Sequence, residues 1–99
     1  MPSFFKVKTW RSDKWLRAVA ELPCVLCERE GMTQAAHRNY GKGMAMKTDD
    51  CWTAALCVSC HADMDQGKEL SREDKRSIMD AAILDTLLAL VNAGRVVLK

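Results

Sequence analysis

Residues 56–65 read LCVSCHADMD. This stretch holds two cysteines, Cys57 and Cys60, followed by His61 and Asp65. A C-x-x-C pair is typical of one half of a tetrahedral zinc site. His61 and Asp65 are four residues apart, so on a helix their side chains would share one face. The stretch indicates either a zinc site with ordinary polar neighbours or a zinc site that positions a second, reactive group.

A second C-x-x-C pair, Cys24 and Cys27 in CVLC, completes a set of four candidate zinc ligands. Residues 28–56 separate the two pairs, which is a longer insert than in a common zinc ribbon, so we expect the insert to fold as a unit between them. Four thiolates would hold zinc at about 2.3 Å with no open coordination position, so this zinc is expected to be structural. Iron in the same cage and a redox dithiol are the alternatives. Cys51 falls outside the pattern.

Length and composition favour one small domain spanning residues 1–99. The chain is 48% hydrophobic and 28% charged, which is ordinary for a globular protein. Its formal net charge of +2 is too small to indicate nucleic-acid binding by itself. The first ten residues, MPSFFKVKTW, contain no long apolar run, so we expect no secretory signal, no membrane span and a cytoplasmic location. Cysteines in such a chain favour metal binding over disulfides.

Local signals predict an α+β fold. Ser12 is an N-cap candidate for a short helix within 11–22, and Pro23 would end it. A strand is expected to end at His37, and a second is expected over CWTAAL, residues 51–56. A helix should begin near Val58 and stop at Gly67.

The C-terminal helix is the most clearly marked element, predicted over 72–93. Ser71 is its N-cap, Asp74 would complete a capping box, and Gly94 suits the position after its end. Its apolar residues cover more than one face: Ile78, Met79, Ala82, Ile83, Leu87, Leu88, Leu90 and Val91. This wide stripe is expected either to pack in the core or to pair with a second copy in a homodimer.

The chain's two histidines, His37 and His61, would be brought near each other by the zinc site. Phosphodiester hydrolysis needs a cation near the phosphate and a neutral imidazole that deprotonates water. His61 and Asp65 are candidates to bind the cation, and His37 is a candidate base. Nearby polar residues could complete the shell: Asn39, Asp49, Asp50 and Asp63. The competing interpretation is that these are ordinary solvated side chains.

CVLC (24–27), AAHRN (35–39) and CVSCHADMD (57–65) together resemble the HNH nucleases, also called ββα-metal or His-Me finger nucleases. The resemblance covers the core motif, residues 24–65. AHRNYGKGMAMKTDD (36–50) and ALCVSCHADMDQG (55–67) are most similar to the small prophage-encoded nucleases of the YbcO family. The resemblance implies a zinc-stabilised ββα-metal unit, here with an N-terminal helix and a long C-terminal helix added.

The same resemblance implies a prophage endonuclease that cuts DNA with Mg²⁺, Mn²⁺ or another divalent cation. His37 falls on the strand histidine that acts as general base. His61 falls on the first helix ligand of the cation. Asp65 falls where the family often has a second helix histidine, and its carboxylate would still offer an oxygen ligand.

Two positions depart from the HNH pattern. Ala36 stands where a metal ligand commonly precedes the strand histidine, and Trp52 stands where an asparagine often orients the base. Asn39 and Asp50 are the candidates to replace that asparagine, and Asp50 is also a candidate cation ligand. That His37 is itself a ligand stays open.

DNA contact is expected from the loop around residues 38–47, through Arg38, Lys42 and Lys47. The form of DNA is left open. A non-catalytic zinc module that binds nucleic acid is the main alternative function. A zinc-stabilised adaptor acting through its C-terminal helix is a third.

Overall fold

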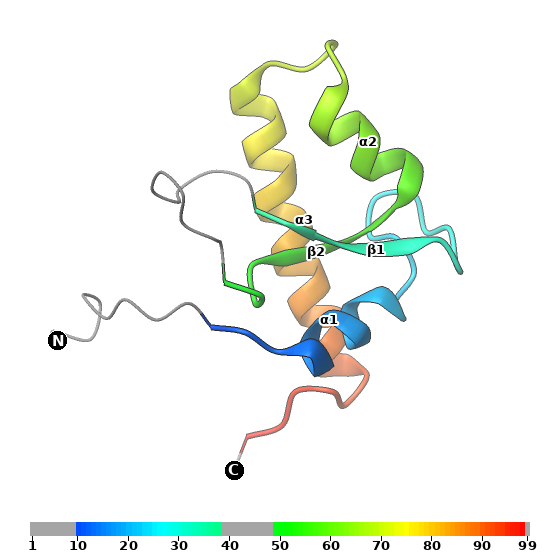
Figure 1. The fold of residues 1–99 in the computed structure, drawn as a ribbon, viewed down its shortest axis with the longest axis vertical. Helices are drawn as coiled ribbons and strands as arrows, with labels where there is room; N and C mark the ends of the chain where they lie inside the picture. The colour runs from blue at the N-terminus through cyan, green and yellow to red at the C-terminus, as the bar shows by residue number, and fades with distance from the viewer. Residues whose placement is uncertain (1–9, 39–48, 99) are drawn as a thin grey trace, which may run out of the picture.

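The structure, a computed structural model, describes residues 10–38 and 49–98. Its elements follow in the order α1 (Asp13–Ala20), β1 (Thr33–His37), β2 (Thr53–Cys57), α2 (Val58–Gln66) and α3 (Arg72–Asn92) (Figure 1). Asn39, Lys42 and Lys47 of the sequence prediction lie outside the described residues. The described part is therefore a small α+β unit with two strands and three helices.

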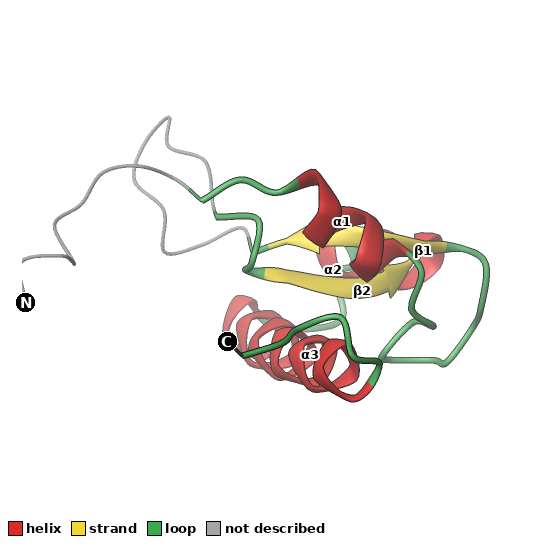
Figure 2. Cartoon of the chain, turned by 90° about the horizontal axis from the view of Figure 1, so that it is seen from below, coloured by secondary structure: helices red, strands yellow, loops and turns green. Residues whose placement is uncertain are grey.

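The two strands pair antiparallel, with Thr33 opposite Cys57 and His37 opposite Thr53. Seen from below, α1 and α3 lie on opposite sides of this sheet (Figure 2). One buried cluster joins Ala55 of β2 to Val19 of α1 and Leu90 of α3. A second buried cluster joins Leu56 to the α3 residues Met79, Ala82 and Ile83. The sheet is thus the middle layer of the fold.

The outer edge of β2 is covered by side-chain and backbone contacts rather than by a third strand. The Ala55 N–H donates to Thr86 Oγ1 at 2.9 Å, and the Ala55 carbonyl accepts from the Val25 N–H at 2.9 Å. Thr86 Oγ1 in turn donates to the Ala82 carbonyl at 2.7 Å. Thr86 is buried in α3. Its hydroxyl therefore gives the Ala55 N–H the hydrogen-bond partner that water provides at an exposed strand edge.

The helix ends follow the local signals. Ser12 Oγ accepts from the Trp15 N–H, Ser71 Oγ accepts from the Asp74 N–H, and Gly94 has a left-handed φ of 74°. Gly67 ends α2 for a different reason than expected. Its φ is −65°, and an added Cβ would lie 2.4 Å from the Asp63 carbonyl oxygen, so a close approach favours glycine there.

Strand β2 begins two residues later and ends one residue later than predicted. Residues 49–52 form a turn in which the Trp52 N–H donates to the Asp49 carbonyl, and Thr53 Oγ1 donates to the Asp50 carbonyl. Cys57 is both the last residue of β2 and the N-cap of α2. The tail 95–98 contains no strand.

The apolar residues of α3 divide between two faces. Met79, Ala82, Ile83 and Leu90 are buried, whereas Leu84, Leu87, Leu88 and Val91 are 65%, 41%, 58% and 46% exposed. We call the last four the α3 stripe. The predicted core packing is therefore confirmed for one face, and the homodimer stays a prediction for the other. No helix in residues 10–38 and 49–98 is long and apolar enough to cross a membrane.

Candidate functional site

The four cysteines of the two C-x-x-C pairs come together as one group. One sulfur from each of Cys24, Cys27, Cys57 and Cys60 lies within 4.8 Å of the others. The Cys27 and Cys57 sulfurs are 3.6 Å apart. Ligands at about 2.3 Å on a tetrahedron would be about 3.8 Å apart, so the group fits a four-coordinate metal such as zinc. The predicted ligand set is therefore assembled, and it could hold a structural metal ion.

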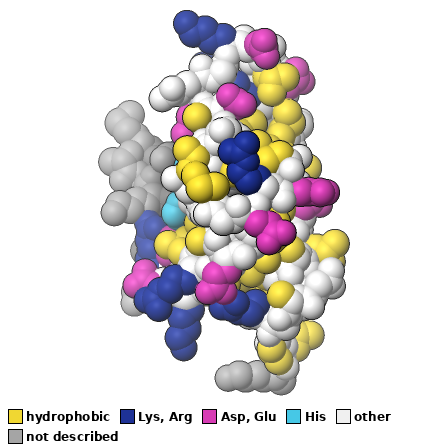
Figure 3. Space-filling model, turned by 90° about the vertical axis from the view of Figure 1, so that its right-hand side faces the viewer, with side chains coloured by type: hydrophobic (Ala, Val, Ile, Leu, Met, Phe, Trp, Pro, Cys, Tyr) yellow, Lys and Arg dark blue, Asp and Glu magenta, His cyan; other side chains and the backbone are white. Residues whose placement is uncertain are grey.

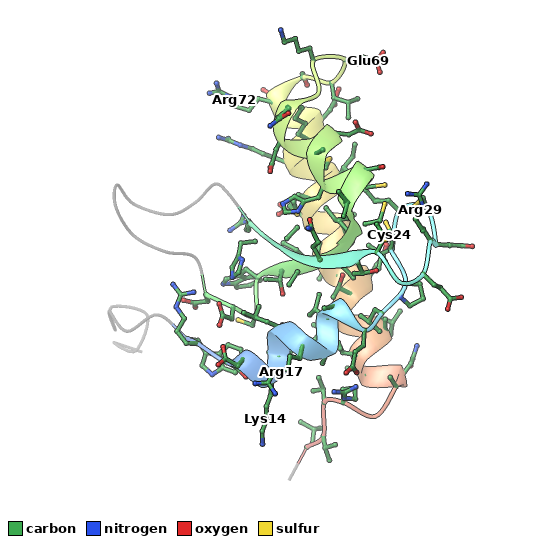
Figure 4. All side chains as sticks on the ribbon, turned by 45° about the vertical axis from the view of Figure 1, so that its right-hand side comes forward. Lys14, Arg17, Cys24, Arg29, Glu69 and Arg72 are labelled. Atoms are coloured by element: carbon green, nitrogen blue, oxygen red, sulfur yellow. The ribbon has the colours of Figure 1, made fainter. Side chains whose placement is uncertain are left out.

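The first cysteine pair sits in a tight turn between α1 and β1. The Glu28 N–H donates to the Cys24 carbonyl at 2.8 Å, and the Cys24 N–H donates to the Arg29 carbonyl at 2.9 Å. Glu28 adopts φ 66°, which an L-residue other than glycine rarely takes. Figure 4 shows sulfur atoms gathered around Cys24, beside Arg29 at the edge of the molecule. The turn aims both thiols at the second pair.

The thiols of this group differ in acidity. Burial alone would raise the pKa of Cys24, but the backbone N–H groups of Cys57, Cys27 and Leu26 lower it to about 6. The Cys60 N–H likewise lowers the pKa of Cys57. Burial and the neighbouring sulfurs raise the pKa of Cys60. Four thiolates so close together repel one another, so full deprotonation requires a cation among them.

His37, the last residue of β1, is held by Asp50. His37 Nε2 lies 3.0 Å from Asp50 Oδ1. Asp50 also accepts from Arg11 Nη1 at 2.8 Å and from the Ser12 N–H at 2.8 Å. Because a carboxylate only accepts, Nε2 carries the hydrogen, and Nδ1 of the neutral ring keeps its lone pair. Nδ1 is therefore the nitrogen available to remove a proton.

Asp50 is 2% exposed and remains ionised. Burial alone would raise its pKa, but hydrogen bonds from His37, the Ser12 N–H and Arg11 outweigh burial and hold the pKa below its ordinary value of 3.8. The fixed charge of Asp50 is therefore available to orient the His37 ring. Of the two predicted replacements for the missing asparagine, Asp50 contacts His37, and Asn39 lies outside the described residues.

A second polar group lies at the start of α2. His61 Nδ1 is 2.8 Å from Gln34 Oε1, so this nitrogen donates and Nε2 keeps its lone pair. His61 Nε2 lies 3.5 Å from Asp65 Oδ2. Two ligands about 2.1 Å from one cation are separated by about 3.0–3.5 Å, so the pair fits two adjacent coordination positions. A histidine that ligates a metal commonly donates its other N–H in this way.

The two histidine groups are attached to opposite faces of β1. Side chains alternate along a strand, so His37 lies on the face of Ala35, and Gln34, which holds His61, lies on the face of Ala36. Among the described residues, only the four cysteines form a group of three or more His, Cys, Asp or Glu ligands within 4.8 Å. Asp50 therefore does not join His61 and Asp65 in such a group, and its oxygens bind His37, Arg11 and Ser12 instead.

Ala36 cannot be replaced by a metal ligand without disturbing the core. It is 0% exposed and packs in the cluster that contains Ala54, Leu56 and Ile83. Ala36 is the position at which the sequence departs from the HNH pattern by lacking a metal ligand. Its burial shows that apolar side chains fill the space that a ligand side chain would occupy.

Arg38, expected to contact DNA, is already held on the protein. Its Nε lies 3.2 Å from Asp80 Oδ1, and its guanidinium stands 5.9 Å from the centre of the Trp52 ring. Trp52 stands at the position where HNH nucleases often have an asparagine that orients the base. In this chain the Trp52 ring instead lies beside the Arg38 guanidinium. Contact of Arg38 with DNA stays a prediction.

Comparison with known families identifies the chain's family. The family model described as Protein of unknown function (DUF968) matches residues 3–83. The chain belongs to the DUF968 family. The matched segment contains all four cysteines, His37, Asp50, His61 and Asp65, and it ends within α3. Separate searches of the curated proteins and of the solved structures found no significant match.

Sequence reasoning missed Gln34 as the partner of His61, and Arg11 and Ser12 as partners of Asp50. Gln34 is three residues before His37, and no local pattern marks it. Each contact joins segments at least 27 residues apart, so none has a signature in sequence spacing.

Proposed function

We propose that this DUF968 protein is a metal-dependent endonuclease of the HNH type that hydrolyses DNA phosphodiester bonds. The observation that carries the proposal is the contact of His37 with Asp50, because it leaves a lone pair on Nδ1 of an oriented imidazole. The order of two antiparallel strands and a helix beside a four-cysteine group also supports it. In this proposal His37 is the general base and His61 and Asp65 are the cation ligands. Because the two groups attach to opposite faces of β1, the substrate has to pass the end of this strand to contact both.

In this proposal His37 Nδ1 takes a proton from the attacking water. Asp50 keeps the ring in one tautomer and stabilises the imidazolium that forms. Arg11 Nη1 donates to the same Asp50 oxygen, Oδ1, at 2.8 Å. The side chain of His37 is 35% exposed, so water and a phosphate can reach it.

The cation would be held by His61 Nε2 and Asp65 Oδ2, with Gln34 fixing the His61 ring. When bound, a divalent cation supplies positive charge next to the phosphate oxygens in the transition state. One carboxylate and one imidazole leave positions open for water and phosphate, and the imidazole favours Ni²⁺ or Mn²⁺ over Mg²⁺. The cysteine-bound zinc would serve the fold, because its four positions are filled.

Plasmid cleavage tests this proposal. Zinc-loaded protein is incubated with supercoiled DNA and Mg²⁺, Mn²⁺ or Ni²⁺, and nicked or linear products are measured. We expect cation-dependent cleavage that falls at least about 100-fold in His37→Ala. Asp65→Asn should also lose activity, whereas Asp63→Asn, on the same helix, should keep it. Cleavage that survives His37→Ala would contradict His37 as the base.

A non-catalytic zinc module that binds nucleic acid is the second candidate. It is favoured by the burial of Ala36 in the core and by the absence, among described residues, of a third clustered ligand beside His61 and Asp65. It predicts DNA binding that is indifferent to added Mg²⁺ or Mn²⁺. Folded, zinc-bound protein that binds DNA but cleaves none with any cation would favour this candidate over the nuclease.

A further inference from the structure

A groove of about 460 Å³ lies between α1 and the C-terminal segment. Its walls include two tryptophans, Trp10 and Trp15, and three cationic side chains, Lys14, Arg17 and Arg95. This volume lies within the range of about 300–1,000 Å³ typical of ligand sites. None of the Cys, His or Asp groups of the candidate functional site lines it.

The two tryptophans form an aromatic wall of the groove, and contacts with the rest of the protein hold their rings in place. Trp15 Nε1 donates to Thr53 Oγ1 at 3.3 Å, which ties its ring to the start of β2. Trp10 packs against Trp15 at nearly a right angle, with ring centres 5.6 Å apart. Trp10 is still 44% exposed, so part of its ring is open to a planar group.

The charge of the groove favours an anion. Arg95 is paired with Glu21 at 2.6 Å, which accounts for the acidic side chain of the lining. Lys14 and Arg17, three residues apart on one face of α1, form no ion pair with any residue of the described part of the chain. Figure 4 shows both extending from α1 away from the sheet, and Figure 3 shows basic side chains, with acidic ones between them, in the lower half of the molecule.

We propose that this groove binds an unpaired nucleic-acid strand, with a base against Trp10 and phosphate on Lys14 and Arg17. Aromatic rings beside a cationic groove are the usual means of holding single strands without reading their sequence. A duplex keeps its base faces inside the stack and cannot offer one to Trp10. The ligand is therefore a single strand or the unpaired part of a larger structure.

The groove adjoins the candidate catalytic histidine. Ser12 lines the groove, and its N–H donates to Asp50, which holds His37. The groove and the support of His37 therefore share Ser12. That the groove selects the nuclease's substrate rests on the proposed function, whereas strand binding does not depend on it.

Fluorescence anisotropy tests the groove. Labelled twelve-nucleotide oligo-dT, a twelve-base-pair duplex and heparin are titrated with zinc-loaded protein without added divalent cation, so that no cleavage intervenes. We expect oligo-dT to bind at least 10-fold more tightly than the duplex. Trp10→Leu should weaken oligo-dT binding by about 5- to 100-fold, and Trp10→Phe should restore most of it, because stacking needs a ring.

Two double variants that remove the same charge distinguish binding in the groove from nonspecific electrostatic attraction of DNA to the protein. Lys14→Ala/Arg17→Ala should reduce the salt dependence of oligo-dT binding by a slope of about 1.4, as expected for two lost phosphate contacts. Lys68→Ala/Arg72→Ala removes the same charge from the opposite end of the molecule, where Figure 4 shows Arg72, and should change little. Zinc content and circular dichroism check that each variant is folded.

Equal affinity for duplex and oligo-dT, or an unchanged affinity in Trp10→Leu, would overturn the groove proposal. Heparin binding as strong as oligo-dT binding would also do so, because heparin has no bases. Failure of cleavage with intact oligo-dT binding would instead count against the nuclease alone. The two proposals can therefore fail separately.

Discussion

Asp50 Oδ1 lies 3.0 Å from His37 Nε2 and is reached by Arg11 Nη1 at 2.8 Å. One buried carboxylate thus joins the end of β1 to the segment before α1. Since the His37 ring is held at Nε2, its orientation depends on an acid 13 residues away in the chain.

Replacing Asp50 should reduce cleavage without removing the base. Asp50→Asn loses the charge that orients His37, so we expect activity to fall about 10- to 100-fold, less than in His37→Ala. Asp49→Asn is the matched control, because Asp49 Oδ1 accepts from the Trp10 N–H rather than from His37. Initial rates of plasmid nicking give the comparison. An equal loss in both variants would argue against a specific role for Asp50.

Asp50 should also make stability depend on acidity. Its pKa is lower in the folded chain than its ordinary value of 3.8, so its contribution is complete above that value and is lost as the pH falls below it. The free-energy difference between wild type and Asp50→Asn should be constant near neutral pH and shrink below about pH 4. Urea unfolding at several pH values measures this difference, with zinc content followed because protons compete for thiolates. A constant difference down to pH 3 would be inconsistent with a lowered pKa.

Cysteine variants should separate the metal group from the fifth cysteine. Cys60→Ser should lose tight zinc binding and much of the folded structure, because a structural zinc site couples metal binding to folding. Cys51→Ser should keep zinc, since Cys51 lies outside the group of four. Burial and the charge of Asp49 also raise the pKa of the Cys51 thiol. Metal analysis and thermal unfolding of both proteins check the assignment.

The hydroxyl of Thr86 should matter more than its methyl group. Thr86→Val keeps the shape but leaves the buried Ala55 N–H without an acceptor, which costs about 1–3 kcal/mol of unfolding free energy. Thr86→Ser retains the acceptor and should lose less. Denaturant unfolding of the zinc-loaded proteins measures both. A valine variant as stable as wild type would mean that another group satisfies the Ala55 N–H.

The α3 stripe should support weak self-association. Leu84, Leu87, Leu88 and Val91 recur at helical spacing and remain exposed. Four side chains are far fewer than the 20–30 residues per partner of a standard interface, so we expect a dimer only at high concentration. Light scattering should show a mass rising above 11.1 kDa with concentration, and Leu88→Glu should abolish the rise. Val97→Glu, outside the stripe, is the control.

Much of the fold could be predicted because its signals are local. Ser12, Ser71 and Gly94 mark helix ends through contacts within a few residues, and cysteine spacing predicted the group of four. The start of β2 was misplaced because the turn at 49–52 depends on the Thr53 hydroxyl.

The candidate site was only partly predictable. Spacing indicated His61 and Asp65, since both lie on one helix. Asp50 was named as a candidate partner of His37, but its contacts with Arg11 and Ser12 come from tertiary packing. The role of Thr86 could not be predicted for the same reason. Nothing in the local sequence of α3 indicates that the Thr86 hydroxyl accepts a hydrogen bond from the edge of β2.

The segment 39–48 is bounded by anchored residues on both sides. The Arg38 N–H donates to the Trp52 carbonyl, and the Asp50 N–H donates to the Trp10 carbonyl, each at 2.9 Å. Both hydrogen bonds use backbone groups, so replacing the side chains of Arg38, Asp50, Trp52 and Trp10 leaves these donors and acceptors in place.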